Sequence, residues 1–217
     1  MGELHIDLHK KAAQLLKLRR EHKDITAEAY DDFIDTVQGF RMALQDLQLT
    51  LVSKVCAVDH LTGVWNRYAM SHRLNQEHER VRRNGEHCVI AIMDFDHFKN
   101  INDRFGHIAG DKVLKVVMNH LSHQIRQYDV IFRYGGEEFL FLLPNTELDE
   151  ATEILERLRS NIKQLPIEMD GDTIHVTVSI GVAAMEAEIN VHDTIELADN
   201  ALLTAKMSGR DCVQVCY

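Results

Sequence analysis

The spacing of hydrophobic and polar residues changes along the chain. From residue 59 onward, apolar runs of strand length alternate with longer stretches in which charged residues recur at helical spacing. This alternation predicts a sheet packed against helices in the order β-α-β-β-α-β with additions, which is an α+β fold. The expected strands span residues 88–93, 130–132, 139–143, 175–183 and 212–215. The expected helices span residues 67–83, 111–126, 148–163 and 193–207.

Within residues 175–183 the hydrophobic positions alternate with polar or small ones. The alternating apolar residues are Val176, Val178, Ile180 and Val182. Because successive side chains of a strand point to opposite faces, this pattern predicts a strand with one buried face.

The first 58 residues have helical periodicity. An early helix is expected to run to about His22, and a second apolar stripe follows it. The stripe advances by alternating steps of four and three through Phe33, Val37, Phe40, Leu44, Leu47 and Leu51. Such a stripe is the seam of a coiled coil or bundle, although a helix facing the core of a monomer shows the same pattern. We expect a helical segment at 1–58, as a helical hairpin or coiled-coil stalk, before the α+β domain at 59–217.

Composition narrows the class of protein. The chain has 217 residues, 45% of them hydrophobic, and a formal net charge of -10. This share of hydrophobic residues is enough for a full hydrophobic core. The negative net charge argues against a groove that binds nucleic acid. Neither a secretory signal nor an apolar run of membrane-spanning length is visible. The cysteines, which have no zinc-finger spacing, are Cys56, Cys88, Cys212 and Cys216.

Two adjacent acids, Glu137 and Glu138, follow Gly135 and Gly136 between two apolar runs. A Gly-Gly pair between strands indicates a tight hairpin, because glycine accepts the positive φ that such turns need and leaves the backbone bare for a ligand. A hairpin with acids at its tip can hold a divalent metal against a phosphate. An acidic turn facing solvent is the alternative.

A second acidic cluster lies upstream. Asp94 follows the apolar run 88–93, where a carboxylate projects at the edge of a sheet, whereas Asp96 is also a favoured helix-capping residue. Carboxylates with a lysine and an amide nearby suit a magnesium nucleotide, because the metal takes protein and phosphate oxygens while the lysine neutralises phosphate. An amide and a carboxylate can also read a base edge. The residues of these types that follow are Lys99, Asn102 and Asp111.

Together these motifs resemble those of the GGDEF family of diguanylate cyclases, in the GGEEF variant, from Asp59 to Tyr217. Several separated segments agree with the family in the same order, which makes the resemblance specific. They are a first motif at 59–67, a metal strand and nucleotide helix at 94–103, a guanine-contacting turn at 105–107 with 110–111, and a phosphate-contacting segment at 205–206 with 209–210. The resemblance implies a palm-like fold, similar to that of nucleotide cyclases and polymerases.

The same resemblance implies condensation of two GTP molecules into cyclic di-GMP with release of two pyrophosphates. The 3′-hydroxyl of one GTP attacks the α-phosphorus of the other, so the site must stabilise an anionic transition state and remove a proton. By similarity, Asp94, the backbone carbonyl of Phe95, Glu137 and Glu138 bind two Mg²⁺ or Mn²⁺ ions per active half-site. Glu137 matches the residue usually assigned as general base, although a hydroxyl coordinated to metal can make a protein base unnecessary. With GTP as substrate, we expect a cytoplasmic protein with reduced cysteines.

The nucleotide contacts follow from the resemblance residue by residue. Asn102 and Asp111 match the guanine readers, and Asp111 suits the N1 and N2 donors of guanine. His107 matches a further substrate contact, with a packed turn residue as the alternative. Three basic residues match the family's phosphate contacts: Lys99, Lys206 and Arg210. Each could equally be an ordinary charge on the protein surface.

An RxxD sequence, from Arg126 to Asp129, ends shortly before the glycine pair. In the family, this position marks an inhibitory site at which the arginine and the aspartate bind cyclic di-GMP. A local contact between Arg126 and Asp129 at a helix end is the alternative. Because RxxD recurs by chance, its position carries the prediction of product inhibition.

His5 and His9 lie one helical turn apart, a spacing that supplies half of a zinc site. Residues 4–58 resemble the second half of a zinc-sensing chemoreceptor-type (CZB) domain, whose ligands are three histidines and a cysteine. We therefore expect a chain cut from a longer sensor, with Zn²⁺ bound only in the full-length regulatory domain. Two surface histidines without a metal role are the alternative.

Ring closure requires two GTP molecules face to face, and each GGDEF domain holds one. A helical stalk leading into Asp59 can pair two such domains, so we expect a homodimer controlled through stalk geometry. Two other functions are compatible with the sequence. One is a catalytically idle module that binds GTP or cyclic di-GMP, and the other is a metal-responsive dimerisation element with a passive cyclase tail. No nucleic-acid or membrane partner is expected.

Overall fold

The computed structural model describes residues 2–55, 57–169 and 171–216. The chain divides into two compact units, Met1–Cys56 and Ala57–Tyr217. The described part of the first unit is helical, and the second contains both helices and strands.

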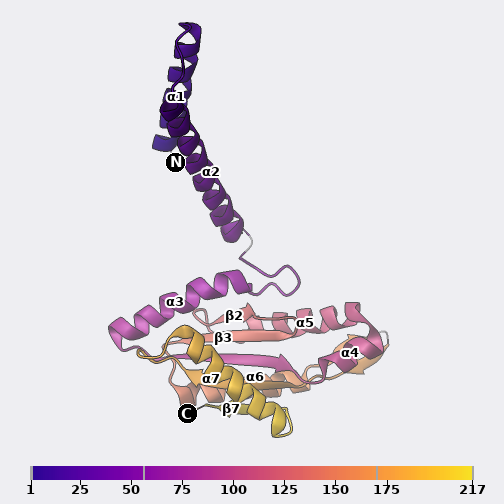
Figure 1. Ribbon diagram of the computed structural model, residues 1–217. Helices are drawn as coiled ribbons and strands as arrows, with labels where there is room; N and C mark the ends of the chain where they lie inside the picture. The colour runs from indigo at the N-terminus through magenta and orange to yellow at the C-terminus, as the bar shows by residue number, and fades with distance from the viewer. Residues whose placement is uncertain (1, 56, 170, 217) are drawn as a thin grey trace. The chain divides into compact units, whose positions relative to one another are not determined.

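The first unit is a hairpin of two helices, α1 (Gly2–Arg20) and α2 (Ala27–Val55), which lie side by side (Figure 1). Polar and aromatic contacts join them. Lys11 Nζ on α1 donates hydrogen bonds to Asp32 Oδ1 (2.8 Å) and Thr36 Oγ1 (2.9 Å) on α2. The ring of His5 stacks on that of Phe40, with ring centroids 5.6 Å apart.

The hydrophobic stripe of α2 is only partly covered within one chain. Phe33, Val37 and Phe40 are half-buried, as expected for a helix that faces its neighbour in a hairpin. Leu44 and Leu47 remain 40% and 41% exposed. The side chain of Leu51, the last position of the stripe, lies outside the described residues. The hairpin therefore accounts for the first half of the stripe and leaves Leu44 and Leu47 exposed.

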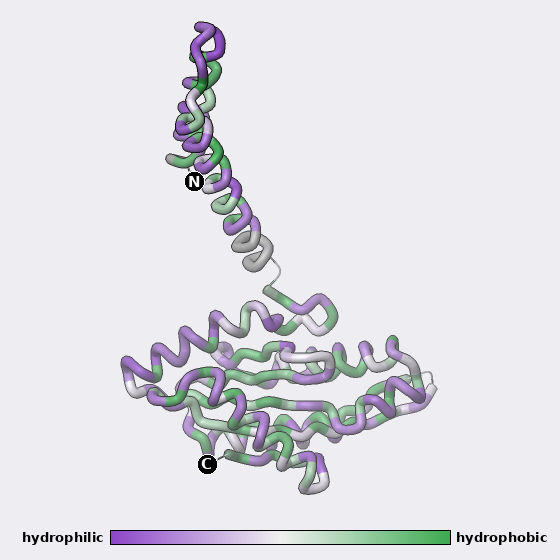
Figure 2. Tube along the Cα trace, viewed as in Figure 1, coloured by the Kyte–Doolittle hydropathy of each residue, from purple (hydrophilic) through white to green (hydrophobic). Residues whose placement is uncertain are grey.

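The second unit is built on a five-stranded sheet with the order β2-β3-β1-β6-β7. Neighbouring strands are antiparallel except for β6 and β7, which are parallel. Every residue of the central strand β1 is buried, and the sheet forms the hydrophobic centre of the unit (Figure 2). The strands are β1 (Cys88–Phe95), β2 (Val130–Arg133), β3 (Glu138–Pro144), β6 (Val178–Ala184) and β7 (Val213–Val215).

Helices cover both faces of this sheet (Figure 1). On one face, α3 and α7 pack against Ile90 and Ile92, and on the other, α5 and α6 pack against Val89, Ala91 and Met93. The β-α-β-β-α-β order expected from the sequence is confirmed. The helices of this unit are α3 (Arg67–Asn84), α4 (Phe98–Phe105), α5 (His107–Ser122), α6 (Leu148–Gln164) and α7 (Val191–Met207).

Two local expectations need correction, and one element was not expected. The helix expected at 111–126 begins earlier and ends earlier, as α5, because Gly106 (φ 83°) separates it from α4. A short hairpin of β4 (Ile167–Met169) and β5 (Asp172–Ile174) was not anticipated. The strand expected at 175–183 begins at Val178 and is buried on both faces, because α7 packs on one face of β6 and α6 on the other.

Gly181 on β6 allows α7 to approach the sheet closely. A Cβ atom at this position would lie 2.1 Å from both the carbonyl oxygen of Ala198 and the backbone nitrogen of Leu202. Such contacts with helix backbone cannot be relieved by a side-chain rotation. The lack of a side chain at Gly181 therefore sets the height of α7 above the sheet.

Among the described helices, none combines the length and apolar character required to cross a membrane.

Three of the cysteines are free thiols: Cys88, Cys212 and Cys216. Burial raises the pKa of Cys88 to about 12, which keeps that thiol protonated. Cys56 lies outside the described residues.

The close approach at Gly181 predicts a large loss of stability in Gly181→Ala. We expect this variant to lower the free energy of unfolding by about 2 kcal/mol, because overpacking against backbone typically costs this much. Urea unfolding of the purified chain measures the change. The control is Gly136→Ala, whose added Cβ would meet no atom within 4 Å. Equal unfolding midpoints for the two variants would contradict the packing described here.

Candidate active site

Three carboxylates meet at one end of the sheet. Asp94 lies near the end of β1 and is directly opposite Glu138, the first residue of β3, in the antiparallel register. Glu137 precedes Glu138 at the tip of the hairpin that joins β2 to β3. Asp94 is buried, whereas the two glutamates are half-buried. The structure therefore brings together the two acidic clusters that the sequence separates.

The electrostatic environment of these acids is unfavourable to their ionised forms. Burial, followed by the negative charge of Asp94, raises the pKa of both Glu137 and Glu138 above the usual glutamate range. Burial also raises the pKa of Asp94, against the opposing effect of Lys206. A site that gathers carboxylates in this way favours the binding of a cation.

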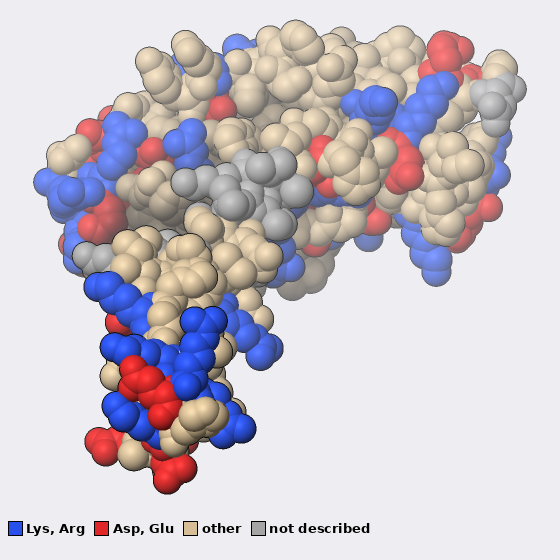
Figure 3. Space-filling view, turned by 90° about the horizontal axis from the view of Figure 1, so that it is seen from above, with Lys and Arg blue, Asp and Glu red and all other residues tan. Residues whose placement is uncertain are grey.

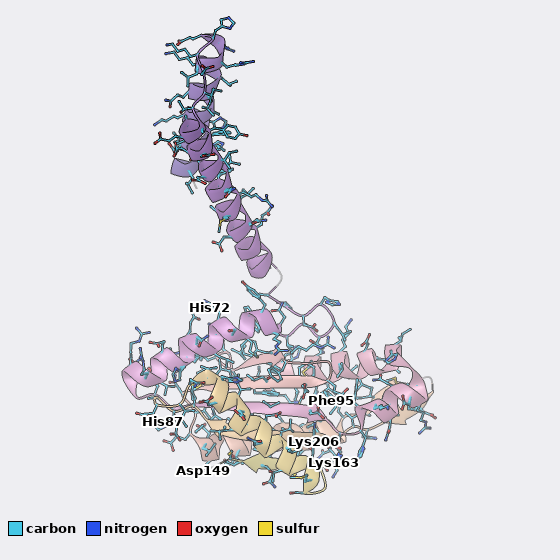
Figure 4. All side chains as sticks on the ribbon, viewed as in Figure 1. His72, His87, Phe95, Asp149, Lys163 and Lys206 are labelled. Atoms are coloured by element: carbon cyan, nitrogen blue, oxygen red, sulfur yellow. The ribbon has the colours of Figure 1, made fainter. Side chains whose placement is uncertain are left out.

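Two basic residues, one in the last turn of α7 and one shortly after the helix, offset the acidic charge. Lys206 Nζ lies 3.0 Å from Asp94 Oδ1, and the charge of Arg210 also acts to lower the pKa of Asp94. Phe95 and Lys206 lie toward the same end of the sheet in Figure 4, with His87 and Asp149 toward the other end. Basic and acidic side chains are interspersed over the face shown in Figure 3. Lys206 and Arg210 are therefore a local source of positive charge beside the acids.

The donor chemistry of the three acids fits Mg²⁺ or Mn²⁺, which prefer carboxylate and carbonyl oxygens. Among the residues that the structure describes, no group of three or more His, Cys, Asp or Glu side chains is arranged to hold a metal ion. Mg²⁺ commonly takes only one or two protein carboxylates, with phosphate oxygens and water as its other ligands.

Arg133 holds the hairpin tip against the first motif. Its Nη1 donates to both carboxylate oxygens of Asp59, at 3.0 Å and 3.1 Å, and its Nη2 donates to the carbonyl oxygen of Gly136 at 2.8 Å. Asp59 also accepts hydrogen bonds from the backbone N–H and hydroxyl of Thr62. Although Arg133 adjoins the glycine pair in the sequence, its partner is 74 residues away, so spacing alone did not reveal this role.

The proposed guanine-reading residues are also brought together. Asn102 lies on α4, and its amide rests above Gly110 on α5, where an added Cβ would lie 2.0 Å from Asn102 Oδ1. Asp111 adjoins Gly110, and His107 begins α5; both are exposed. Lys99 lies exposed on α4. The α4–α5 corner thus presents an amide and a carboxylate on neighbouring turns.

Asp96 has a role different from helix capping. The N-cap of α4 is His97, which has a φ of 56° and makes no side-chain capping bond. The buried carboxylate of Asp96 instead accepts hydrogen bonds from Thr177 Oγ1 (2.7 Å), Ser179 Oγ (2.6 Å) and the backbone N–H of Asp211 (3.0 Å). These partners are 81 to 115 residues away in the chain, so no local pattern could have revealed them.

The RxxD residues make two different contacts. The buried carboxylate of Asp129 accepts the backbone N–H of Arg126 at 2.9 Å, which closes a local turn before β2. The guanidinium of Arg126 is directed elsewhere, with Nη2 donating to Glu150 Oε1 at 2.6 Å on α6. The local contact that was the alternative to an inhibitory site therefore forms through the arginine backbone, and the arginine side chain remains on the surface.

The histidine pair of α1 is close enough to share a ligand or a proton. His5 Nε2 and His9 Nε2 are 3.1 Å apart, and both residues are exposed. Two nitrogens are too few for the tetrahedral set of a structural zinc site. Whether His5 and His9 belong to a zinc site therefore stays a prediction.

Comparison with known proteins shows similarity over the second unit. Residues 56–212 match the family described as "Diguanylate cyclase, GGDEF domain". The chain is 47% identical over 157 residues to the diguanylate cyclase DgcP of Pseudomonas aeruginosa, covering 72% of this chain and 23% of that protein. It is 36% identical over 163 residues to the response regulator PleD of Caulobacter vibrioides, covering 74% of this chain and 36% of that protein. The chain thus spans well under half the length of these two relatives.

Solved structures show the same similarity. The GGDEF domain of DgcB from Caulobacter crescentus, in complex with c-di-GMP, matches with a TM-score of 0.71 and 29% identity, covering 74% of this chain and 93% of that one. The diguanylate cyclase SiaD of Pseudomonas aeruginosa, in complex with its activator SiaC, matches with a TM-score of 0.73 and 33% identity. That match covers 99% of this chain and 80% of the SiaD chain.

The ion pair between Asp59 and Arg133 predicts a pH-dependent stability. Burial raises the pKa of Asp59, but the hydrogen bonds from Thr62 and the charge of Arg133 outweigh burial and hold that pKa below its usual range. The carboxylate therefore stabilises the fold above the ordinary aspartate pKa of about 4, and this contribution is lost as the pH falls through the lower folded pKa.

We expect Asp59→Asn to lower the free energy of unfolding by about 1–3 kcal/mol at pH 7, because the variant leaves a partly buried Arg133 without its charge partner. The difference from the unsubstituted chain should shrink as the pH falls below about 4, as measured by urea unfolding across that range. Asp103→Asn, at an exposed position, is the control and should change stability by less than about 0.5 kcal/mol. A difference that grows toward low pH would contradict the assignment.

Proposed function

The chain belongs to the GGDEF family of diguanylate cyclases, and from this premise we propose that it condenses two GTP molecules into cyclic di-GMP and releases two pyrophosphates. The observation that carries the proposal is the meeting of Asp94, Glu137 and Glu138 beside Lys206 at one end of the sheet. Carboxylates for metal ions and cations for phosphate are the groups that phosphoryl transfer requires. Three unpaired thiols among the described cysteines agree with a cytoplasmic location, where GTP is available.

In this proposal the α4–α5 corner binds the base of GTP. Asn102 and Asp111 hydrogen-bond to guanine, and His107 adds a substrate contact at the start of α5. The carboxylate of Asp111 accepts the N1–H and N2–H donors that distinguish guanine from adenine. The close approach of Asn102 to Gly110 supports this assignment, because it holds the amide beside Asp111.

The triphosphate extends from this corner toward the acids. Lys99 on α4, Lys206 on α7 and Arg210 after α7 supply positive charge to its oxygens. Lys206 pairs with Asp94 in the structure, so it exchanges a carboxylate partner for a phosphate when the nucleotide binds. Both groups are anionic oxygen acceptors for an ammonium.

Two Mg²⁺ or Mn²⁺ ions would be held by Asp94, the carbonyl oxygen of Phe95, Glu137 and Glu138. When bound, the ions polarise the α-phosphate and lower the pKa of the attacking 3′-hydroxyl. Burial and the negative charge of Asp94 raise the pKa of Glu137 in the metal-free site, and a bound cation would act against that rise. Glu137 matches the residue that the family uses as general base, and the proposal gives it that role. Direct deprotonation of a coordinated hydroxyl is the alternative route for the same proton.

Because each catalytic domain supplies one GTP, the proposed active form is a homodimer. The helical segment at 1–58 is the proposed pairing and regulatory element, and the exposed Leu44 and Leu47 on α2 support a contact with another helix. The domain at 59–217 is the proposed cyclase. Product inhibition would use Arg126 and Asp129, and cyclic di-GMP must compete there with Glu150 for the guanidinium.

Substitution of Glu137 separates binding from turnover. We expect Glu137→Gln to lower the rate of cyclic di-GMP formation about 100-fold or more, because it removes both a metal ligand and a proton acceptor. Guanine recognition at Asn102 and Asp111 should persist, as measured by GTP affinity in the presence of Mg²⁺. The control is Glu153→Gln, at an exposed position of α6. Binding of GTP without turnover by the unsubstituted chain would instead support an idle binding module.

The contact between Arg126 and Glu150 predicts opposite effects on product inhibition. Arg126→Ala should weaken inhibition by cyclic di-GMP at least about tenfold, because a charge-assisted contact is lost. Glu150→Gln should strengthen inhibition by up to about fivefold, because it removes a competing surface ion pair. Initial rates of pyrophosphate release at increasing cyclic di-GMP concentrations measure both. The same inhibition constant in both variants would reject this site.

A further inference from the structure

The carboxylate of Asp96 joins two segments that are far apart in the chain. Thr177 and Ser179, at the start of β6, donate to it from one side, and the backbone N–H of Asp211 donates to it from the turn that follows α7. The backbone N–H of Asp96 also donates to the carbonyl oxygen of Thr177 at 2.9 Å. Asp96 is 6% exposed, so these bonds form out of contact with bulk water. A buried carboxylate with three donors is a rigid junction.

The turn after α7 has an unusual backbone. Gly209, Arg210 and Asp211 have φ values of 109°, 64° and 48°. Left-handed conformations are unfavourable for residues with a Cβ, and two such residues in succession persist only where the surroundings hold them. The turn is therefore held in place by its contacts.

Asp211 supplies those contacts from its side chain as well as its backbone. Its carboxylate accepts hydrogen bonds from the guanidinium of Arg159 and from Lys163 Nζ at 2.7 Å, both on α6. Its backbone N–H donates to Asp96. The residue is thus bonded to α6 by its side chain and to the end of β1 by its backbone. We call this pair of residues the Asp96–Asp211 clamp.

Arg210 lies between Gly209 and Asp211 in the turn after α7. Its backbone N–H donates to the carbonyl oxygen of Ala205 at 3.1 Å, while its side chain is exposed. Because Asp211 is held on two sides, the Cα position and the Cα–Cβ direction of Arg210 are constrained. No hydrogen bond or ion pair of the Arg210 side chain to another described residue accompanies this constraint. The guanidinium is therefore available to a ligand.

We propose that the Asp96–Asp211 clamp positions Arg210 to bind the triphosphate of GTP. This inference rests on the proposed function, and it assigns positioning roles to two aspartates that do not themselves touch the nucleotide. A left-handed turn held between β1 and α6 fixes the Cα–Cβ direction of Arg210, whose charge already acts on Asp94 in the acid cluster. The arginine then does not lose backbone freedom on binding, which favours affinity for phosphate.

Binding of 3′-deoxy-GTP tests the clamp without turnover, because this analogue lacks the attacking hydroxyl. We expect Arg210→Ala and Asp96→Asn each to weaken its affinity about tenfold, the effect of losing one charge-assisted hydrogen bond. Both carboxylate oxygens of Asp96 accept hydrogen bonds. In Asp96→Asn an NH₂ group would replace one of these oxygens and would face a donor instead of accepting from it. Isothermal titration with Mg²⁺ present measures the affinities, and competition by guanosine, which lacks phosphate, reports guanine binding.

Two readouts separate positioning from a general loss of structure. The affinity for guanosine should be unchanged in both variants, because guanine is bound by Asn102 and Asp111. The double variant should bind 3′-deoxy-GTP within about twofold of either single variant, whereas independent effects would multiply to about a hundredfold. The control is Thr146→Val, which removes a buried hydroxyl bonded to the carbonyl oxygen of Pro144 at the other end of β3. It should lower stability but leave both affinities unchanged.

The outcomes are distinct. Unchanged 3′-deoxy-GTP affinity in Asp96→Asn, an equal loss of guanosine affinity, or multiplicative effects in the double variant would overturn the clamp and leave the proposed function intact. Failure of the unsubstituted chain to bind 3′-deoxy-GTP would reject the proposed function itself. Should Asp96→Asn not fold, Asp211→Gly tests the same link from the turn. Glycine keeps the N–H and accepts the positive φ but loses the bonds to α6, and wild-type affinity in this variant would also overturn the proposal.

Discussion

Buried negative charge at the end of β1 is the constraint on which the second unit depends. The antiparallel register places Asp94 opposite Glu138, and burial then makes each carboxylate unfavourable to ionise beside the others. Positive charge must therefore be brought close. Lys206 supplies it from α7, and α7 can lie near enough because Gly181 leaves its backbone room against the sheet. The packing of a helix and the charge of a site are thus parts of one arrangement.

Polar bonds on either side of this cluster connect it to the rest of the unit. On the hairpin side, Arg133 links the carboxylate of Asp59 to the carbonyl oxygen of Gly136. On the helix side, Asp96 links the start of β6 to the turn after α7. Both links use a buried or half-buried charged side chain that makes several hydrogen bonds, and such bonds can rigidify a structure. The acids and cations of the cluster are thereby connected to residues outside it.

Much of the architecture was predictable because its signals are local. Apolar runs of strand length and helical charge spacing identified the core order, and the Gly135-Gly136-Glu137-Glu138 sequence identified the acidic hairpin. Local signals failed where a neighbour in space changed the outcome. The pattern of residues 175–183 predicted one buried face, yet α7 covers the other, and the start of α5 depended on the break at Gly106. Propensity and periodicity report a segment by itself, and packing then overrides them.

What the sequence by itself determined is the set of elements and the chemistry carried by each: acids after a central strand, glycines and acids at a hairpin, cations near the last helix. Tertiary structure alone decided which of these groups meet. Asp96 accepts a hydrogen bond from Asp211, and Asp59 accepts one from Arg133. The Arg126 side chain bonds to Glu150 instead of Asp129. The physical reason is that hydrogen bonds and ion pairs act over a few ångströms, and residues tens of positions apart reach that range only after the strand register and helix packing are established.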